Sequence, residues 1–256
     1  MEIWGIVVTV SAAVLLAEWL LMQSWTLPGL LLYSVMLILL LLYSTFRWPR
    51  QQRQMLVFTI PAVSRLMAFT LPLGSLSPLF AQLVVAVPVG LTAVFFVSLL
   101  GQEWPALHFA WRRTPYYLFL IALGAGGGLL LFQFQQPTPL IWSSPLILLF
   151  NIFVLVILMA FLEEWLFREI MQTALTRLWG DNLLAGFVVA FFYTALSLGQ
   201  GPWPFILLIF VLTLALSWLR RVSNSLLSVF LLHGALNLTF FLILPGMANM
   251  GRIIEF

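Results

Sequence analysis

Long apolar runs separated by short polar loops make up most of this chain. The hydrocarbon core of a bilayer is about 30 Å thick, so a helix needs ~20 apolar residues to cross it. The weakest of the runs is 55–73, which carries Pro61 and, in mid-span, Arg65. The pattern predicts an all-α integral membrane protein, a polytopic bundle of about nine transmembrane helices at residues 3–22, 28–46, 55–73, 78–100, 116–134, 140–172, 183–199, 205–219 and 227–245.

Composition supports the same class. The 256 residues are 63% hydrophobic and 7% charged, with a mean hydropathy of +1.11, whereas soluble domains carry ~25% charged residues. All eleven basic residues are arginine, and no basic run with interleaved aromatics occurs, so the formal charge of +3 does not indicate a nucleic-acid surface. The absence of cysteine excludes disulfides, thiolate catalysis, iron–sulfur clusters and prenyl or palmitoyl attachment.

The arginines predict an orientation. The loops at 23–27, 74–77, 135–139 and 200–204 carry no charge, whereas the arginines fall in four other loops, at 47–53, 112–113, 168–177 and 220–221. If 55–73 crosses the membrane, all arginine-bearing loops lie on one side, which the positive-inside rule makes cytoplasmic. We therefore expect a cytoplasmic N-terminus and a C-terminus on the opposite side. The first run lacks a basic n-region, which favours a retained span over a cleaved signal peptide.

The most informative stretch lies near the end of the run 140–172. Glu163, Glu164 and Glu169 fall within nine positions there, although the whole chain has only eight acidic residues. A charged side chain at the bilayer centre costs roughly 2.5–3.5 kcal/mol on insertion scales, so it usually has a partner or a function. Glu164 and Arg168 are i, i+4 and can pair on one helix face, which leaves Glu163 free to act as a base. The alternative, that the acids only terminate the helix at the cytoplasmic surface, is less favoured.

A second polar pair lies in the last run. His233 and Asn237 are also four residues apart, so their imidazole and amide share one face of a helix that could face the glutamates. A lone histidine within a membrane often makes only an interhelical hydrogen bond. Taken by itself, this pair leaves a structural and a functional role open.

Other features indicate packing, and some exclude activities. Glu18 and Arg65 are expected to form a buried structural ion pair, with a transport relay as the alternative. Gly124 and Gly128 form a small-xxx-small pair that lets helices approach closely. The chain contains no His-Glu-x-x-His, Gly-x-Ser-x-Gly or Walker motif. Asp181 is the single aspartate, which excludes an aspartyl intramembrane protease because that mechanism needs two.

The two polar clusters together resemble a known family. Glu163-Glu164-x-x-x-Arg168, followed two helices later by His233-x-x-x-Asn237, resembles the CAAX protease and bacteriocin-processing (CPBP, or Abi) family of intramembrane proteases over roughly 140–245. The resemblance implies that Glu163 is the general base that activates water, with Glu164 and Arg168 as its supporting pair. It also implies that His233 and Asn237 steady the water and the developing oxyanion. No cofactor is expected: the family is often labelled as metalloproteases, but two histidines in the whole chain make a zinc site hard to build.

The second family motif is degenerate in this chain. The family has an aromatic-x-x-x-His on the helix after the glutamates, and aligning Tyr193 with the aromatic places Ser197 at the histidine position. Serine cannot hold a proton near pH 7, and loss of one acid–base partner typically costs ~10²–10⁴-fold in rate. Three outcomes stay open: a slow reaction on Glu163 and His233 alone, a contribution from His108, or loss of activity.

We expect an N-terminal transmembrane extension of about five helices at 1–139 and a CPBP-like core of about four helices at 140–256. The first functional hypothesis is a glutamate-dependent intramembrane endopeptidase that cuts its substrate at a cavity open to the cytoplasmic side. The alternative is a catalytically inactive scaffold or assembly subunit of a larger membrane complex. A transporter comes third, because the halves show no hydropathy symmetry. Expected partners are the lipid bilayer and a membrane-protein or peptide substrate or partner subunit, and no nucleic acid.

Overall fold

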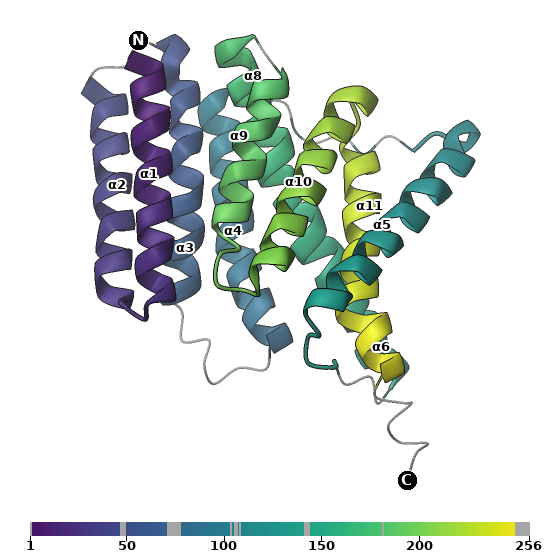
Figure 1. Ribbon diagram of the computed structural model, residues 1–256. Coiled ribbons are helices and arrows are strands. Elements are labelled where there is room, and N and C mark those ends of the chain that lie inside the picture. Colours follow the sequence, from purple (N-terminus) through teal and green to yellow (C-terminus); the bar gives the residue numbers. More distant parts are fainter. Residues whose placement is uncertain are drawn as a thin grey trace.

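The protein is a bundle of helices. The computed structural model describes residues 2–46, 50–70, 78–102, 104, 107, 109–140, 144–180 and 182–248, and these ranges contain no strand. Successive long helices stand side by side and run in alternating directions (Figure 1). The predicted all-α membrane architecture is therefore confirmed.

The described residues of the first half form five α-helices and two 3₁₀ segments, which lie at Arg50–Thr59 and Trp111–Arg113. The helices are α1 (Glu2–Met22), α2 (Thr26–Phe46), α3 (Ile60–Thr70), α4 (Pro78–Leu100) and α5 (Thr114–Phe134). In Figure 1, α1, α2 and α3 form one end of the bundle, whereas α5 lies at the other end beside α11.

The second half begins with one long helical stretch, Pro145–Trp179, which is built from five consecutive segments. These are α6 (Pro145–Phe153), a π-helical turn region (Val154–Phe161), α7 (Leu162–Glu164), a second π-helical region (Trp165–Gln172) and α8 (Thr173–Trp179). The remaining helices are α9 (Asn182–Ala195), α10 (Trp203–Ser223) and α11 (Leu226–Leu238), which continues into a π-helical end (Thr239–Ile243).

The predicted spans correspond to helices of two lengths in the described residues. Three apolar helices are shorter, at Gln54–Phe69, Ala86–Leu100 and Leu183–Ala195. The other six are long and apolar enough to cross a membrane, at Trp4–Met22, Thr26–Ser44, Trp111–Phe134, Pro145–Trp179, Trp203–Ser223 and Leu226–Ala248. The count of about nine is confirmed, and the weak run around Arg65 is helical as expected.

Local sequence signals set the ends of the helices in the second half. Ser144 and Ser225 are N-caps whose side chains accept hydrogen bonds from backbone amides of the first turns of α6 and α11. Gly180 and Asn224 end α8 and α10 in the left-handed conformation, at φ 67° and 47°, as glycine and asparagine commonly do. These stops fix where the polar residues of each helix lie along its length.

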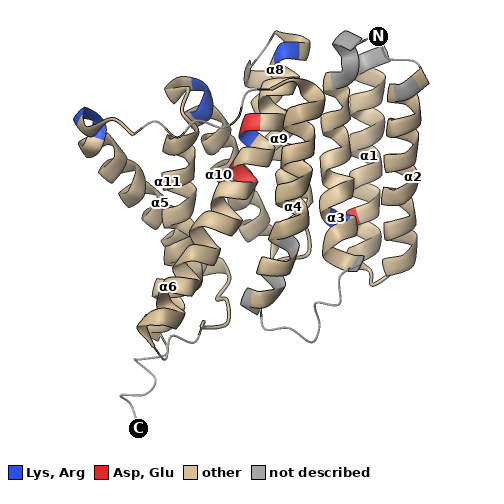
Figure 2. Ribbon diagram, turned by 180° about the vertical axis from the view of Figure 1, so that it is seen from behind, with Lys and Arg blue, Asp and Glu red and all other residues tan. Residues whose placement is uncertain are grey.

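The exposed arginines gather at one end of the bundle. Figure 2 shows the blue residues at the beginning of α5, on α8 and at the end of α10, all near the end where α1 begins. They are Arg112, Arg113, Arg177 and Arg221. Arg168 is an exception to the predicted loop assignment, because it is 0% exposed and lies inside the bundle. The assignment of Arg168 to a cytoplasmic loop was therefore wrong. Arg168 lies within the long helix, where it forms a buried ion pair with Glu164.

Two glycines bring α5 against α11, as the small-xxx-small pattern predicts. A Cβ at Gly124 would collide with the Leu232 carbonyl oxygen, and one at Gly128 would lie 2.8 Å from the Leu236 carbonyl oxygen. Both carbonyls directly precede the predicted site residues His233 and Asn237. The close approach of α5 therefore holds the helix that presents those two side chains.

The division of the chain into an N-terminal extension at 1–139 and a core at 140–256 stays a prediction.

Candidate active site

The glutamate pair lies between the two π-helical regions of the long helix. π-helical turns within an α-helix are rare and are frequent at functional sites. Arg168 and Glu164 form an i, i+4 ion pair with Nη1 3.2 Å from Oε1, and both side chains are 0% exposed. Arg168 also donates to the Thr213 carbonyl at 3.3 Å, and its guanidinium stacks over the Tyr193 ring at 5.0 Å. The predicted pairing of Glu164 with Arg168 thus occurs.

His233 on α11 contacts the adjacent glutamates through its two ring nitrogens. Its Nδ1 lies 2.5 Å from Oε1 of Glu164, and its Nε2 lies 3.8 Å from Oε2 of Glu163. Glu164 is paired with Arg168, so it is a carboxylate and can only accept hydrogen bonds. Nδ1 therefore carries the proton and donates to Glu164, which leaves Nε2 facing Glu163.

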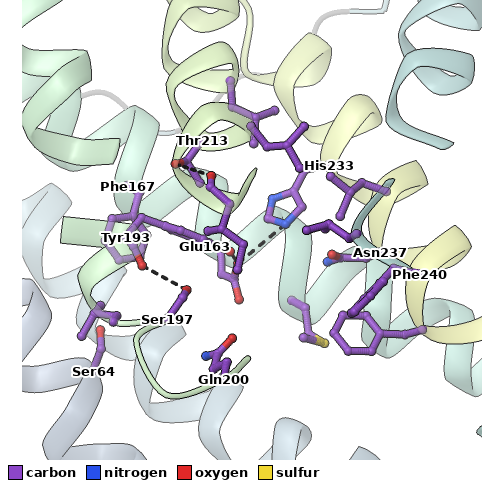
Figure 3. A pocket seen from close by; sticks show the side chains of 18 of the residues that line it. Ser64, Glu163, Phe167, Tyr193, Ser197, Gln200, Thr213, His233, Asn237 and Phe240 are labelled. Atoms are coloured by element: carbon purple, nitrogen blue, oxygen red, sulfur yellow. Dashed lines mark hydrogen bonds and ion pairs between the residues drawn. The ribbon is translucent and has the colours of Figure 1, made fainter. Parts of the chain in front are cut away.

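Glu163 has a different environment from Glu164. Its side chain is 32% exposed, whereas that of Glu164 is 0% exposed. The Tyr193 hydroxyl on α9 donates to Oε2 of Glu163 at 2.5 Å. Of the two carboxylates, Glu163 is therefore the one that a water molecule or a substrate can reach. Figure 3 shows it pointing into the cavity between Tyr193 and His233.

Ser197 and Asn237 lie at the same cavity but bond elsewhere. Ser197 lies in the turn that follows α9, and its hydroxyl donates to the Tyr193 carbonyl oxygen at 3.2 Å. The Asn237 amide donates to the Leu155 carbonyl oxygen at 3.3 Å. Both residues line the cavity, so the structure brings all seven predicted residues together. His108, the other histidine considered, lies outside the described residues.

The cavity has a volume of about 570 Å³ and is lined by both halves of the chain. Its described lining includes Ser64, Arg65 and Ala68 from α3 and Val89 from α4, in addition to residues of α5, α9, α10 and α11. Sequence analysis missed this contribution of the N-terminal helices. The charge of Arg65 in an apolar run, which the sequence explained only by a structural pair with Glu18, was the signal that could have revealed it.

A buried charge cluster anchors that N-terminal wall. Arg65 binds both carboxylate oxygens of Glu18, at 2.5 and 2.6 Å, and Tyr33 donates to Glu18 at 2.5 Å. Arg65 also donates to the carbonyl oxygen of Leu196, the neighbour of Ser197. The predicted Glu18–Arg65 ion pair is present, and it ties α1 and α3 to the end of α9.

The donor set does not fit a catalytic zinc ion. Such a site uses three protein ligands at about 2.0–2.3 Å and one open position. No group of three or more His, Cys, Asp or Glu side chains that could hold a metal ion occurs in the described parts of the chain. Nδ1 of His233 is already bonded to the Glu164 carboxylate, and that carboxylate also pairs with Arg168.

The family described as Type II CAAX prenyl endopeptidase Rce1-like matches the chain over residues 145–239. This segment of the chain is similar to the Rce1-like family. The match confirms the predicted resemblance to CAAX proteases and spans the helices from α6 to the end of α11. The Rce1-like segment thus carries Glu163, Glu164, Arg168, Tyr193, Ser197, His233 and Asn237. Comparison with curated proteins and with solved structures gave no match.

Proposed function

We propose that the protein is an intramembrane endopeptidase in which Glu163 is the general base. The observation that carries the proposal is the convergence of Glu163 and Nε2 of His233 on one cavity, within 3.8 Å of each other. A water molecule placed against both atoms would have its proton acceptor and a second polar contact within hydrogen-bond reach. The Rce1-like match over 145–239 supports the same class of reaction.

The residues divide into distinct roles in the proposed reaction. Glu163 takes a proton from water as the water oxygen attacks the peptide carbonyl carbon. The proton then passes from Glu163 to the leaving nitrogen as the carbon–nitrogen bond breaks, which yields a carboxylic acid and an amine. His233 orients the water through Nε2, and Glu164 with Arg168 fixes the ring, much as a buried carboxylate fixes the histidine of a serine-protease triad. Asn237, at the cavity wall, is placed to contact the developing oxyanion.

In the proposed reaction, the presence of Ser197 lowers the rate of cleavage. It occupies the position of the second-motif histidine and lines the same cavity, but it cannot exchange a proton near pH 7. The loss of one acid–base partner is expected to lower the rate by ~10²–10⁴-fold. Assays therefore need long incubations with a membrane-protein or peptide substrate.

The first test compares new peptide termini in membranes that contain the wild-type chain or Glu163→Gln. Termini that arise only with the wild type, as read by mass spectrometry, identify the cleavage sites and support the proposal. Glu169→Gln is the matched control, since Glu169 lies on the same helix but pairs with Arg220 outside the cavity. Identical sets of termini for wild type and Glu163→Gln would contradict the proposal.

Ser197 also favours a second candidate, a catalytically inactive scaffold or assembly subunit. In that case the side chains that line the cavity stabilise the fold but do not catalyse a reaction. Co-purification of a stable partner with both wild type and Glu163→Gln, with no cleavage by either, would support it. A chain that purifies without a partner and cleaves a substrate would exclude it.

We propose further that the N-terminus and the arginine-rich end are cytoplasmic and that the C-terminus lies on the opposite side. The gathering of exposed arginines at one end supports this orientation (Figure 2).

A further inference from the structure

The cavity beside Glu163 has its rim at the turn between α9 and α10. Gln200, in this turn, is exposed, whereas the other described residues that line the cavity are buried or partly buried. Gln135, which follows α5, also lines the cavity and lies against Gly201 of the same turn. In Figure 3, Gln200 lies below Glu163, on the side to which the carboxylate points.

This rim lies at the end of the bundle opposite the arginines. The α9–α10 turn and the end of α5 point away from the end where α1 begins (Figure 1), whereas the arginines lie at that beginning (Figure 2). With the proposed orientation, Gln200 lies on the side opposite to the cytoplasmic opening that we expected from the sequence. Short α9 explains the difference, because its 14 residues extend for about 21 Å at 1.5 Å per residue. The turn that follows this helix carries Gln200, the exposed residue of the described lining.

Apart from the charged residues, the described lining of the cavity combines uncharged polar side chains with apolar ones. Amides and hydroxyls come from Gln135, Gln200, Ser64, Ser197 and Asn237. The apolar side chains include those of Leu131, Phe205, Ile209, Phe240 and Phe241. The cation at the cavity wall, Arg65, is already bound through two nitrogens to Glu18. An anionic ligand would therefore lose its hydration without gaining a free countercharge.

We propose that the cavity is entered at the α9–α10 turn, from the non-cytoplasmic side, by an uncharged apolar peptide segment of another membrane protein. The amides and hydroxyls of the lining provide hydrogen bonds for an extended backbone, and the apolar residues of the lining accept its apolar side chains. The proposed function makes this segment the substrate of Glu163. The route of entry itself does not depend on catalysis, so it can be tested separately.

The route is tested by cysteine labelling, which the cysteine-free chain allows without background. Three single variants are made in the full chain: Gln200→Cys at the rim, Ser197→Cys inside the cavity, and Asn224→Cys, which is exposed in the turn between α10 and α11 at the arginine end. A bulky membrane-impermeant maleimide is applied to intact spheroplasts and to inverted vesicles, and a small charged thiosulfonate is applied in the same way.

The proposal predicts opposite labelling of the two ends. Gln200→Cys reacts with the maleimide from the outside and Asn224→Cys from the inside, and Ser197→Cys reacts with the thiosulfonate from the outside. Reaction of Ser197→Cys from the inside, or from neither side, would overturn the route. Reaction of Gln200→Cys and Asn224→Cys from the same side would overturn the orientation. None of these readouts requires cleavage, so they can fail while the proposed function stands.

The class of ligand is tested by protection of Ser197→Cys. A short end-blocked synthetic peptide of apolar and uncharged polar residues, added from the outside, should slow the reaction with thiosulfonate at least ~10-fold at saturation. The same peptide with a central aspartate should protect weakly. Equal protection by the charged and uncharged peptides, or no protection by either, would contradict an uncharged peptide as the occupant.

Discussion

His233 lies between two adjacent glutamates of one helix, with Nδ1 2.5 Å from Glu164 and Nε2 3.8 Å from Glu163. The two contacts are not equivalent, because Glu164 is fully buried and paired with Arg168 whereas Glu163 reaches the cavity. One carboxylate therefore fixes the imidazole, and the other stays available for chemistry. Adjacent residues on a helix point about 100° apart, which is how one helix can present both roles to one histidine.

The hydroxyl of Tyr193 is predicted to hold Glu163 in place. Tyr193→Phe removes the 2.5 Å hydrogen bond but keeps the ring that stacks on Arg168. A hydrogen bond to a charged group contributes about 1.5–3 kcal/mol, so kcat should fall by ~10-fold or more with little change in KM. Tyr116→Phe, outside the cavity, is the control. An unchanged kcat for Tyr193→Phe would show that the carboxylate needs no such support.

Replacement of Ser197 by histidine is predicted to raise the rate. Ser197→His places an imidazole one turn from Tyr193, in a cavity of about 570 Å³ that can accept it. A restored acid–base partner should increase cleavage by ~10-fold or more, toward the 10²–10⁴-fold contribution typical of such groups. Ser197→Asn, which adds bulk without a titrating group, should not. A gain with both variants, or with neither, would mean that the second motif is not what limits the reaction.

The contact of α5 with α11 is predicted to control the site through packing. Gly124→Ala pushes a Cβ into the Leu232 carbonyl oxygen, next to His233, and overpacking of this kind costs about 1–3 kcal/mol. Thermal unfolding in detergent should occur at a lower temperature, with reduced cleavage. Gly126→Ala is a close control on the same helix, because a Cβ there meets nothing within 4 Å. Equal stability of the two variants would contradict the close approach of the helices.

The Glu18–Arg65 pair is predicted to stabilise the N-terminal wall mainly by avoiding an unpaired charge. Arg65→Leu leaves Glu18, which is 2% exposed, without its bidentate partner, and breaking a buried pair costs about 3–5 kcal/mol. The double variant Glu18→Gln with Arg65→Leu should regain much of the lost stability in the same unfolding measurement. If the double variant is less stable than Arg65→Leu alone, the loss of stability does not come from the unpaired charge of Glu18.

The sequence predicts the helices and the short-range pairs well. Run length and hydropathy predict the helices, because hydrocarbon thickness sets how many apolar residues a span needs. The Glu164–Arg168 pair follows from helical spacing, and the Glu18–Arg65 pair follows because two lone charges in apolar runs need partners. The assignment of Tyr193 and Ser197 to a degenerate second motif stays a prediction.

Relations between distant helices could not be predicted in this way. Sequence periodicity contains no signal that His233 donates to Glu164 instead of Glu163, since this depends on the rotation of α11 against the long helix. The π-helical regions around the glutamates add residues to a turn without an obvious marker such as proline. The shortness of α9 likewise sets the rim at Gln200, although the predicted run extends to residue 199. These features depend on packing between helices. Packing is a property of pairs of segments, so the periodicity of one segment does not predict it.

The most direct test of the central claim is a double-mutant cycle on cleavage rate with Glu163→Gln and His233→Gln. If the two side chains act together on one water molecule, each single variant lowers kcat/KM by ~10²–10⁴-fold, and the double variant falls little further than the worse single variant. Cleavage by Glu163→Gln at the wild-type rate would contradict the account.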